Sequence, residues 1–166
     1  ELPPGVKAVK LDEMSFKGFP PIRLSEKSDG EMLAALLYTS GTSGNPKGVM
    51  LTADNLNSNI NQCITKAGFT KKDIFMGLLP QFHSFGFTVT TLLPAVIGSK
   101  TVYMAKFNPR KVLEILRTHR PTIMVAIPSM YNAILNTKSA TAEDFQSIHL
   151  AGSGGEALPA AVYEGY

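Results

Sequence analysis

A glycine-rich segment with hydroxyl side chains and one lysine is the part of this 166-residue sequence best suited to chemistry. It reads YTSGTSGNPKGVM (residues 38–50) and lies between two apolar runs. Glycines allow the backbone to approach an anion where a Cβ would collide, and successive backbone N–H groups can converge on that anion. Lys47 adds the point charge that a phosphate chain requires. The segment predicts a polyphosphate-binding loop made of Thr39, Ser40, Gly41, Thr42, Ser43, Gly44 and Lys47.

The loop differs from the Walker pattern G-x-x-x-x-G-K-[ST], which places glycine before the lysine and a hydroxyl residue after it. Pro46 precedes Lys47 and Gly48 follows it, so the pattern fails. The composition of the loop also fits a solvated connector. We favour phosphate binding over a connector because hydroxyl side chains and a lysine stand together between the two apolar runs.

A second segment, LPQFHSFGF (79–87), places one histidine among three phenylalanines. His83 has two interpretations, a packed core residue or a hydrogen-bond donor to a carboxylate or phosphate oxygen. Phe82 and Phe87 likewise belong either to the core or to the wall of an acyl pocket. The residues alone leave both alternatives open.

A third segment, LAGSGGEALP (150–159), combines Gly152, Gly154 and Gly155 with an acidic residue before an expected helix. It is either a plain helix-entry turn or a ligand contact. Glu156 would complement the dipole of a helix that starts beside it. A hydrolase elbow, G-x-S-x-G, is excluded because an alanine stands at its first glycine position.

Alternating strands and helices are expected to hold these segments. Apolar runs bounded by turn residues predict strands, and apolar residues recurring at helical spacing predict helices. The expected strands are 33–38 in a buried apolar run, 48–51 after the glycine loop, 73–80, 101–105, 122–127 and 147–152. The expected helices are 52–66, 85–100 with a proline inside it, one starting at Asn108 and Pro109, 128–136, and one after the glycines. We therefore predict an α/β fold with a mainly parallel sheet of about five or more strands flanked by helices.

Composition and charge limit the classes of function. A net charge of +3 without any run of basic residues gives little support to nucleic-acid binding and is compatible with an anionic small molecule. The single cysteine, Cys63, excludes an internal disulfide and a multi-cysteine metal site, and we interpret it as structural. No apolar run approaches the roughly 20 residues of a membrane span, so none is expected in this chain.

The ends of the chain bear on its domain organisation. Residues 1–30, which contain four prolines, are expected to form an irregular entry segment, and residues 31–166 an α/β core. The chain begins with Glu1 rather than Met and stops inside a helical pattern. We therefore expect it to be truncated at both ends.

The three segments, in this order, resemble the motifs of the adenylate-forming superfamily of AMP-dependent synthetases and ligases. YTSGTSGNPKGVMLTADNL (38–56) resembles the phosphate-loop signature, LPQFHSFGF the aromatic–histidine motif, and LAGSGGEALP the glycine turn that precedes the adenine site. FHSFGF and SGGEAL are most similar to acyl-CoA and acyl-carrier-protein synthetases that handle fatty acids. The resemblance implies a part of the large N-terminal domain of an adenylating enzyme.

The resemblance also implies an ATP-dependent ligase with two half-reactions. A carboxylate, expected to be a fatty acid, attacks the α-phosphorus of ATP and gives an acyl-adenylate and pyrophosphate. A thiol of coenzyme A or of an acyl-carrier protein then takes the acyl group. ATP and Mg²⁺ are implied as cofactors, and a small carboxylic acid as a partner, with no nucleic acid. A cytoplasmic location is expected, with membrane association of the longer protein as an alternative.

Residue roles follow from the same resemblance. Lys47 and His83 are implied to be catalytic, and residues 39–47 to hold the β- and γ-phosphates, with Thr39 reaching Mg²⁺ through the ATP. The implied adenine and acyl contacts are Gly152, Gly154, Gly155 and Glu156, and the implied acyl-pocket wall is Phe82 and Phe87.

Some motifs of the superfamily are not present within these 166 residues. They are a Tyr-Gly-x-Thr-Glu segment whose acid binds Mg²⁺, an aspartate for the ribose, and a lysine on a C-terminal domain. We therefore expect the isolated chain to be inactive. A non-enzymatic nucleotide- or anion-binding α/β module is the alternative from another class.

Overall fold

The structure, a computed structural model, describes residues 29–39 and 45–165. The expected entry segment 1–30 and the loop residues 40–44 therefore lie almost wholly outside the described residues. The strands are β1 (Leu33–Thr39), β2 (Lys47–Thr52), β3 (Ile74–Gly77), β4 (Lys100–Tyr103), β5 (Ile123–Ala126) and β6 (Leu150–Ser153). The helices are α1 (Ala53–Ala67), α2 (Ser84–Gly86), η2 (Phe87–Leu92), α3 (Leu93–Ile97), α4 (Pro109–His119), α5 (Pro128–Leu135), η3 (Ala142–Phe145) and α6 (Ala160–Glu164).

Four of the described strands form a parallel sheet in the order β4-β3-β5-β6, which confirms the predicted α/β class. The first two strands do not join this sheet. β1 and β2 pair with each other in antiparallel register, with Thr39 opposite Lys47. The predicted single sheet of five or more strands is therefore wrong. Only residues 40–46 connect the two strands, and a parallel crossover needs about a dozen residues, so a hairpin is the geometry this loop permits.

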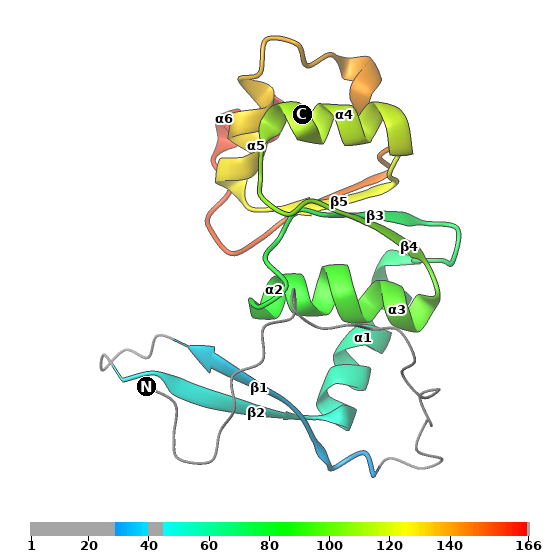
Figure 1. The fold of residues 1–166 in the computed structure, drawn as a ribbon, viewed down its shortest axis with the longest axis vertical. Coiled ribbons are helices and arrows are strands. Elements are labelled where there is room, and N and C mark those ends of the chain that lie inside the picture. Colours follow the sequence, from blue (N-terminus) through cyan, green and yellow to red (C-terminus); the bar gives the residue numbers. More distant parts are fainter. Residues whose placement is uncertain (1–28, 40–44, 166) are drawn as a thin grey trace, which may run out of the picture.

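The parallel sheet is covered by helices on both faces (Figure 1). Side chains alternate between the faces along each strand, as the period of two requires. In β3, Phe75 points to the layer of α1, α2 and α3, whereas Met76 points to the layer of α4, α5 and α6. In β5, Ile123 and Met124 divide in the same way. The molecule therefore has two hydrophobic cores, one on each face of the sheet.

The predicted helices after Thr52 and Asn108 are confirmed, with their caps. Thr52 and Asn55 form a capping box at the start of α1, and Gly68 ends the helix in the left-handed conformation. Asn108 caps α4, where its Oδ1 accepts hydrogen bonds from the N–H groups of the second and third residues after it. Pro109 occupies the first helical position, at which no N–H donor is needed.

The predicted helix 85–100 is helical from Ser84 to Ile97 but has a wide, π-helical middle in η2. The proline within it explains one hydrogen bond between this segment and the sheet. Pro94 has no N–H to offer the Thr90 carbonyl in the α-helical pattern, and this carbonyl accepts the hydroxyl of Tyr103 at 2.7 Å instead. The helical segment is thereby tied to the end of β4.

A polar network joins the sheet strands at their amino ends. The Asp73 carboxylate, almost fully buried, lies 2.8 Å from Nε2 of His149 and accepts the hydroxyl of Thr122 at 2.9 Å. Burial alone would raise the pKa of Asp73, but hydrogen bonds from His149, Thr70 and Thr122 outweigh it and lower the pKa. The network supports the register of β6 beside β5, which gives His149 a structural role.

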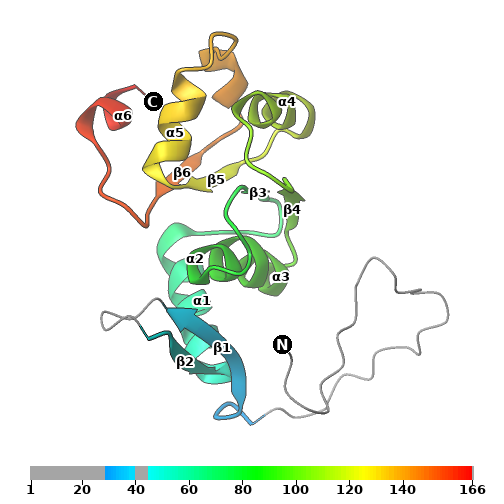
Figure 2. The ribbon, with the colours of Figure 1, turned by 60° about the vertical axis from the view of Figure 1, so that its left-hand side comes forward.

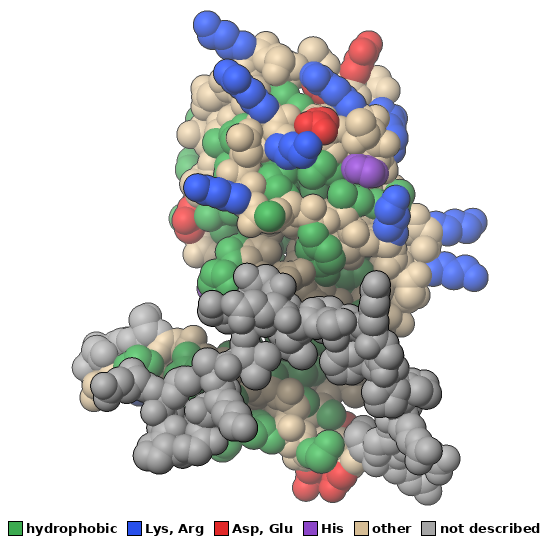
Figure 3. Space-filling view, viewed as in Figure 1, with side chains coloured by type: hydrophobic (Ala, Val, Ile, Leu, Met, Phe, Trp, Pro, Cys, Tyr) green, Lys and Arg blue, Asp and Glu red, His purple; other side chains and the backbone are tan. Residues whose placement is uncertain are grey.

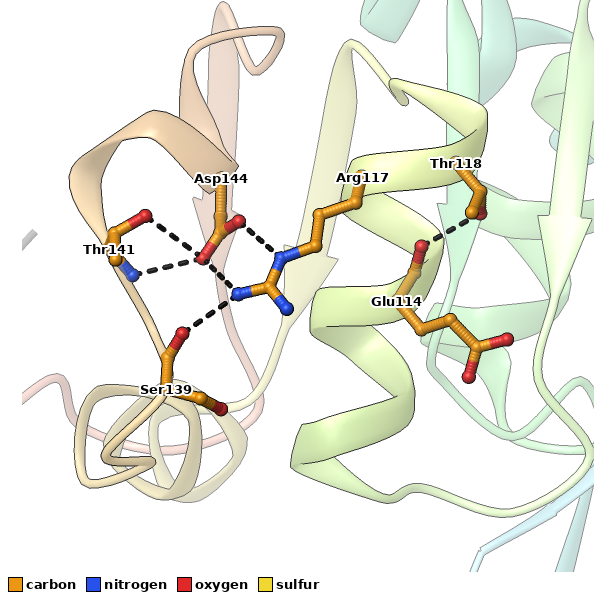
Figure 4. Close-up of polar contacts among 6 residues, drawn as sticks. All are labelled: Glu114, Arg117, Thr118, Ser139, Thr141 and Asp144. Atoms are coloured by element: carbon orange, nitrogen blue, oxygen red, sulfur yellow. Dashed lines mark hydrogen bonds and ion pairs between the residues drawn. The ribbon is translucent and has the colours of Figure 1, made fainter.

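A second polar network connects α4 to the turn η3, on the face of the sheet that α4, α5 and α6 cover (Figure 4). The guanidinium of Arg117 donates to both carboxylate oxygens of Asp144, at 2.7 and 3.0 Å, and to the carbonyl of Ser139. Thr141 donates its N–H to the same carboxylate at 2.9 Å. These hydrogen bonds, that of Arg117 first, lower the pKa of Asp144 to about 2.

The hairpin is exposed, which corrects the prediction of a buried strand at residues 33–38. Leu36 is 47% exposed and Tyr38 is 72% exposed, although the sequence of β1 is apolar. Figures 1 and 2 show the hairpin beside α1, outside the layers that cover the parallel sheet. A strand is buried only where a second layer covers each apolar face, and within residues 29–39 and 45–165 the main neighbour of the hairpin is α1.

Surface charge and helix length can be described for the residues that the structure places. On the face drawn in Figure 3, Lys and Arg side chains are spread among neutral and hydrophobic ones over the upper half of the molecule. Among the described residues, no helix is both long enough and apolar enough to cross a membrane.

Candidate active site

The loop after β3 carries His83 to the carboxyl edge of the parallel sheet, where α/β folds bind ligands. His83 is exposed, so it is not the packed core residue of the first interpretation. Its Nδ1 accepts the N–H of Phe85 at 3.3 Å and caps α2. A neutral ring that accepts at Nδ1 carries its proton on Nε2, so Nε2 is available as a donor to an oxygen of a ligand.

The glycine turn follows β6 at the same edge of the sheet, one strand further along from β5. Gly155 has φ 85°, a left-handed conformation that glycine adopts without strain. Gly154 lies against the ring of Phe85. The approach is so close that a Cβ at this position would come within 3.0 Å of two ring carbons. Phe85 of α2 and the glycine turn therefore touch, which places α2, the helix that His83 caps, beside Gly154.

Tyr131 holds the start of the glycine turn by hydrogen bonds, and the sequence analysis did not identify it. Its hydroxyl lies 2.9 Å from the carbonyl oxygens of Met124 and Gly152 and so bridges β5 and β6. Burial raises the pKa of this phenol well above its usual range, so the hydroxyl stays protonated. The one available signal was its position at the start of α5, directly after a strand of the sheet.

A groove of about 460 Å³ opens beside the glycine turn and runs between α1, the helical segment 84–97 and β6. Phe85, Val89 and Leu93 form its helical wall, while Val125 and Gly152 belong to the sheet side. These walls are mainly apolar, and Gly152 and the neighbouring Ser153 line the end nearest the turn. The groove can therefore hold an apolar chain whose polar head lies at the carboxyl edge of the sheet.

The two phenylalanines named from the sequence lie elsewhere. Phe82 is 88% exposed and lines a different pocket, of about 470 Å³, together with Tyr103 and Lys106. Phe87 is half-buried in η2. The aromatic residues that line the groove are Phe69 and Phe85, and the roles of Phe82 and Phe87 as acyl-pocket residues stay predictions.

The glycine turn does not lead straight into a helix, as the sequence had suggested. α6 begins only at Ala160, and Glu156 lies outside its first turn, exposed to solvent. The reason is Pro159, which keeps the preceding residue out of the helical region. The expected interaction of Glu156 with the helix dipole is therefore absent, and a contact of Glu156 with adenine stays a prediction.

The phosphate-loop residues that the structure describes stand at the open end of the hairpin. Thr39 and Lys47 are paired across β1 and β2, and both side chains are exposed. The predicted positions 40–44 lie outside the described residues. The hairpin lies on the side of the sheet on which α1 and α2 are packed, so Lys47 and His83 belong to the same side of the molecule (Figures 1 and 2).

A metal site made of protein side chains is not evident in the described ranges. Within 29–39 and 45–165, no three His, Cys, Asp or Glu side chains come together as a possible metal site. The prediction that Thr39 meets Mg²⁺ through the phosphates of ATP is not tested by this finding.

Comparison with known proteins identifies the class. The model of the AMP-binding enzyme family matches residues 5–166, and the chain belongs to this family. A long-chain-fatty-acid–CoA ligase from Bacillus subtilis (strain 168) is 35% identical over 135 residues, which cover 78% of this chain and 24% of the relative. The mitochondrial malonate–CoA ligase of Homo sapiens is 32% identical over 145 residues, 79% of this chain and 25% of the relative.

Solved structures agree with these relatives. ATP-bound MatB from Rhodopseudomonas palustris superimposes with a TM-score of 0.76 at 31% identity, over 83% of this chain and 27% of that one. This confirms the predicted family and the predicted place of the fold within an adenylate-forming enzyme. The chain spans about a quarter of the length of the curated relatives it matches.

Proposed function

We propose that the full-length protein carrying this chain is an ATP-dependent acid–thiol ligase that activates a fatty acid. One observation carries the choice of acid: the groove that opens at the glycine turn has mainly apolar walls, including Phe85, Val89 and Leu93. A small dicarboxylate would place its second charge against these apolar walls, which is costly. The family match and the relatives that act as CoA ligases support the reaction class.

The reaction consists of two substitutions. A carboxylate oxygen of the acid attacks the α-phosphorus of ATP, and the bond to pyrophosphate breaks. In the second step the sulfur of a thiol, which loses its proton, attacks the acyl carbonyl carbon and displaces AMP. We take coenzyme A as the thiol because the matched relatives are CoA ligases, and an acyl-carrier protein is the alternative.

Residues of this chain would bind and orient the reactants. Lys47, exposed at the open end of the hairpin, places a positive charge beside the leaving pyrophosphate. His83 offers its Nε2 proton to a carboxylate or phosphate oxygen at the carboxyl edge of the sheet. Gly154 lets the turn approach the ring of Phe85, where a Cβ would collide, and Gly155 supplies the left-handed conformation of a turn proposed to contact the adenylate. Mg²⁺, when bound to the ATP phosphates, would neutralise charge that develops there, with Thr39 beside it.

The isolated chain is proposed to lack activity. Catalysis of this kind depends on groups that converge from several segments, and a partial set loses most of the electrostatic stabilisation. The chain supplies a phosphate loop, His83 and a glycine turn, and it covers about a quarter of its relatives. Weak anion or nucleotide binding is the activity expected to remain. A cytoplasmic location is proposed for the full-length protein.

The experiment is ATP–pyrophosphate exchange with acids from butyrate to palmitate and with malonate, run on the 166-residue chain beside the full-length protein. We expect exchange by the full-length protein with fatty acids but not with malonate, and none by the 166-residue chain. Exchange with malonate alone would contradict the choice of acid. Robust exchange by the short chain would contradict the account of the site.

A further inference from the structure

Tyr131 lies near the start of α5, at the carboxyl edge of the sheet that carries the proposed site. α5 begins with Pro128, directly after β5, and side chains on a helix point back towards its amino end. Tyr131 is 4% exposed, and its hydroxyl lies 2.9 Å from the carbonyl oxygens of Met124 and Gly152. The hydroxyl therefore reaches the strand that leads into the glycine turn.

The backbone hydrogen bonds between β5 and β6 weaken where the glycine turn begins. Among the described strands, β6 is at the edge of the sheet, with β5 as its neighbour. The last pair in their register joins Ala126 and Ser153. Past this pair, the nitrogen of Gly154 lies 3.4 Å from the carbonyl oxygen of Ala126, which is long for a hydrogen bond. A side-chain hydrogen bond to Gly152 therefore adds support where the backbone ladder ends.

The hydroxyl of Tyr131 is not needed to fill the core. The ring packs in the same core as Leu116 and Ile134, and a phenylalanine ring would occupy the same space. A buried hydroxyl adds little net stability, because the hydrogen bond that it makes largely replaces one that it made to water. The hydroxyl is therefore better explained by what it holds, the carbonyl at the start of the glycine turn.

We propose that Tyr131 is a positioning residue for adenylate formation, whose hydroxyl holds the carbonyl of Gly152 and with it the conformation of the glycine turn. The inference rests on the proposed function, in which this turn contacts the adenylate. Phe85 of α2 touches the same turn at Gly154, so α2 and α5 both hold it. Without the hydroxyl, part of the ordering of the turn is left to the moment of nucleotide binding, which weakens that binding.

The test is ATP–pyrophosphate exchange by the full-length protein, with the fatty acid that supports the fastest exchange. Tyr131→Phe should raise the KM for ATP about three- to tenfold, the range expected for one hydrogen bond between neutral groups. The KM for pyrophosphate should not change, because the phosphate loop lies on the hairpin. A merely structural role would lower the fraction of folded enzyme, and so the rate, at an unchanged KM for ATP. That result would overturn the inference.

Tyr103→Phe is the matched control. It removes the same atom and the same kind of hydrogen bond, because the hydroxyl of Tyr103 donates to the carbonyl of Thr90 at 2.7 Å, but this carbonyl lies in η2. We expect its KM for ATP to equal that of the wild type. An equal increase in both variants would overturn the inference, since the effect would then not belong to the glycine turn.

Tyr131→Leu separates the hydroxyl from the packing of the ring. This variant lacks both, so it should lower the melting temperature more than Tyr131→Phe does. Its KM for ATP should nevertheless rise by the same factor, because each variant loses the same hydrogen bond. A KM that follows the loss of melting temperature across the two variants would assign the effect to packing and overturn the inference.

Amide hydrogen exchange of residues 150–158 in the full-length protein, without substrates, measures the turn itself. Exchange in this segment should be faster in Tyr131→Phe than in the wild type, and it should be unchanged in Tyr103→Phe. Equal exchange in Tyr131→Phe and the wild type would overturn the inference even if the KM for ATP rises. Failure of the proposed function gives a different result, in which the wild-type full-length protein shows no exchange of pyrophosphate with any carboxylic acid.

Discussion

The hairpin β1–β2 and strand β5 have similarly apolar sequences but opposite environments. β1 reads LAALLYT and has Leu36 47% exposed, whereas β5 reads IMVA and is buried along its whole length. The difference lies in what covers each strand. β5 has a strand on either side and helices above and below it, whereas the main contacts of the hairpin within residues 29–39 and 45–165 are those between its own strands and with α1. Apolar composition predicts a strand, and the arrangement of layers decides whether it is buried.

The two regions also hold different parts of the proposed site. His83, the glycine turn and the groove stand on the packed sheet, while Thr39 and Lys47 stand on the exposed hairpin. Regions with few buried apolar contacts open at lower free energy than packed cores. We expect the acyl and adenine contacts to be preorganised and the phosphate contacts to be the adaptable part of the site.

The largest expected effect compares the same substitution in the two regions. Leu116 is fully buried in the core under α4, and Leu116→Ala should lower the free energy of unfolding by about 2–5 kcal/mol, because it leaves a cavity. Leu36→Ala, on the exposed hairpin, should cost less than about 1 kcal/mol. Urea unfolding of both variants of the 166-residue chain measures the contrast. Equal losses would show that the hairpin is packed in solution as tightly as the core.

Lys47→Ala should act on activity rather than on stability. The side chain is exposed, so the melting temperature should not change. Loss of a charge-assisted hydrogen bond to phosphate should cost about 1.5–3 kcal/mol of transition-state stabilisation, roughly 10- to 150-fold in pyrophosphate exchange by the full-length protein. Lys100→Ala is the matched control. Lys100 is an exposed lysine at the amino end of β4, whereas the proposed site lies at the carboxyl ends of the strands. An unchanged rate for Lys47→Ala would remove this residue from the site.

Much of the sheet region could be predicted from the sequence, because its signals are local. Thr52, Gly68 and Asn108 stand at helix ends in the structure, where capping chemistry favours these residue types, and the predicted helices beside them are confirmed. The order of strands and helices after residue 52 was also correct, since apolar runs between turn residues determine it. The π-helical register of η2 was not predictable, because it depends on packing between distant segments.

The predictions failed where the structure depends on segments that are distant in the sequence but pack together. Whether residues 33–38 are buried depends on layers outside the strand, and nothing within its own sequence shows them. Phe82 and Phe87 were predicted to form an acyl-pocket wall, which stays a prediction, and the aromatic residues that line the groove are Phe69 and Phe85. Phe82 precedes the helical segment 84–97, and within that segment helical phase separates Phe85 from Phe87, where the irregular turn of η2 changes the phase. Tyr131 was missed because its partners are backbone carbonyls, which carry no sequence signal.

Substitutions at His83 separate its role as the cap of α2 from its proposed role as a hydrogen-bond donor in adenylate formation. His83→Asn should keep the cap of α2, because asparagine also accepts a backbone N–H at this position, but it removes the Nε2 donor. We expect single-turnover adenylate formation to slow about tenfold, which corresponds to about 1.4 kcal/mol, with little change in melting temperature. His83→Ala should show the same rate and additionally a small loss of stability. A normal rate for His83→Asn would assign the residue to capping alone.

The smallest expected effect is a pH dependence that belongs to the packed region. The Asp144 carboxylate accepts hydrogen bonds from Arg117 and Thr141, and its pKa falls from 3.8 to about 2 on folding. A carboxyl group with a lowered pKa in the folded state stabilises the protein fully above its unfolded pKa. This stability is lost as the pH falls from about 3.8 towards 2. Because the side chain of Arg117 is half exposed, solvent screens the pair, and we expect a contribution of about 1 kcal/mol.

The measurement is the free energy of unfolding in urea at pH 6 and at about pH 2.5, for the wild-type chain and for Asp144→Asn. The variant should be less stable by about 1 kcal/mol at pH 6, and the difference should shrink at the lower pH, where the wild-type carboxylate becomes protonated. Other acids, including Asp73, titrate in both proteins and cancel in the difference. Glu156→Gln, at an exposed position of the glycine turn, serves as the control and should show no such pH-dependent difference. A constant difference between wild type and Asp144→Asn at both pH values would mean that Asp144 stabilises α4 and η3 by packing and hydrogen-bond geometry, not by its charge.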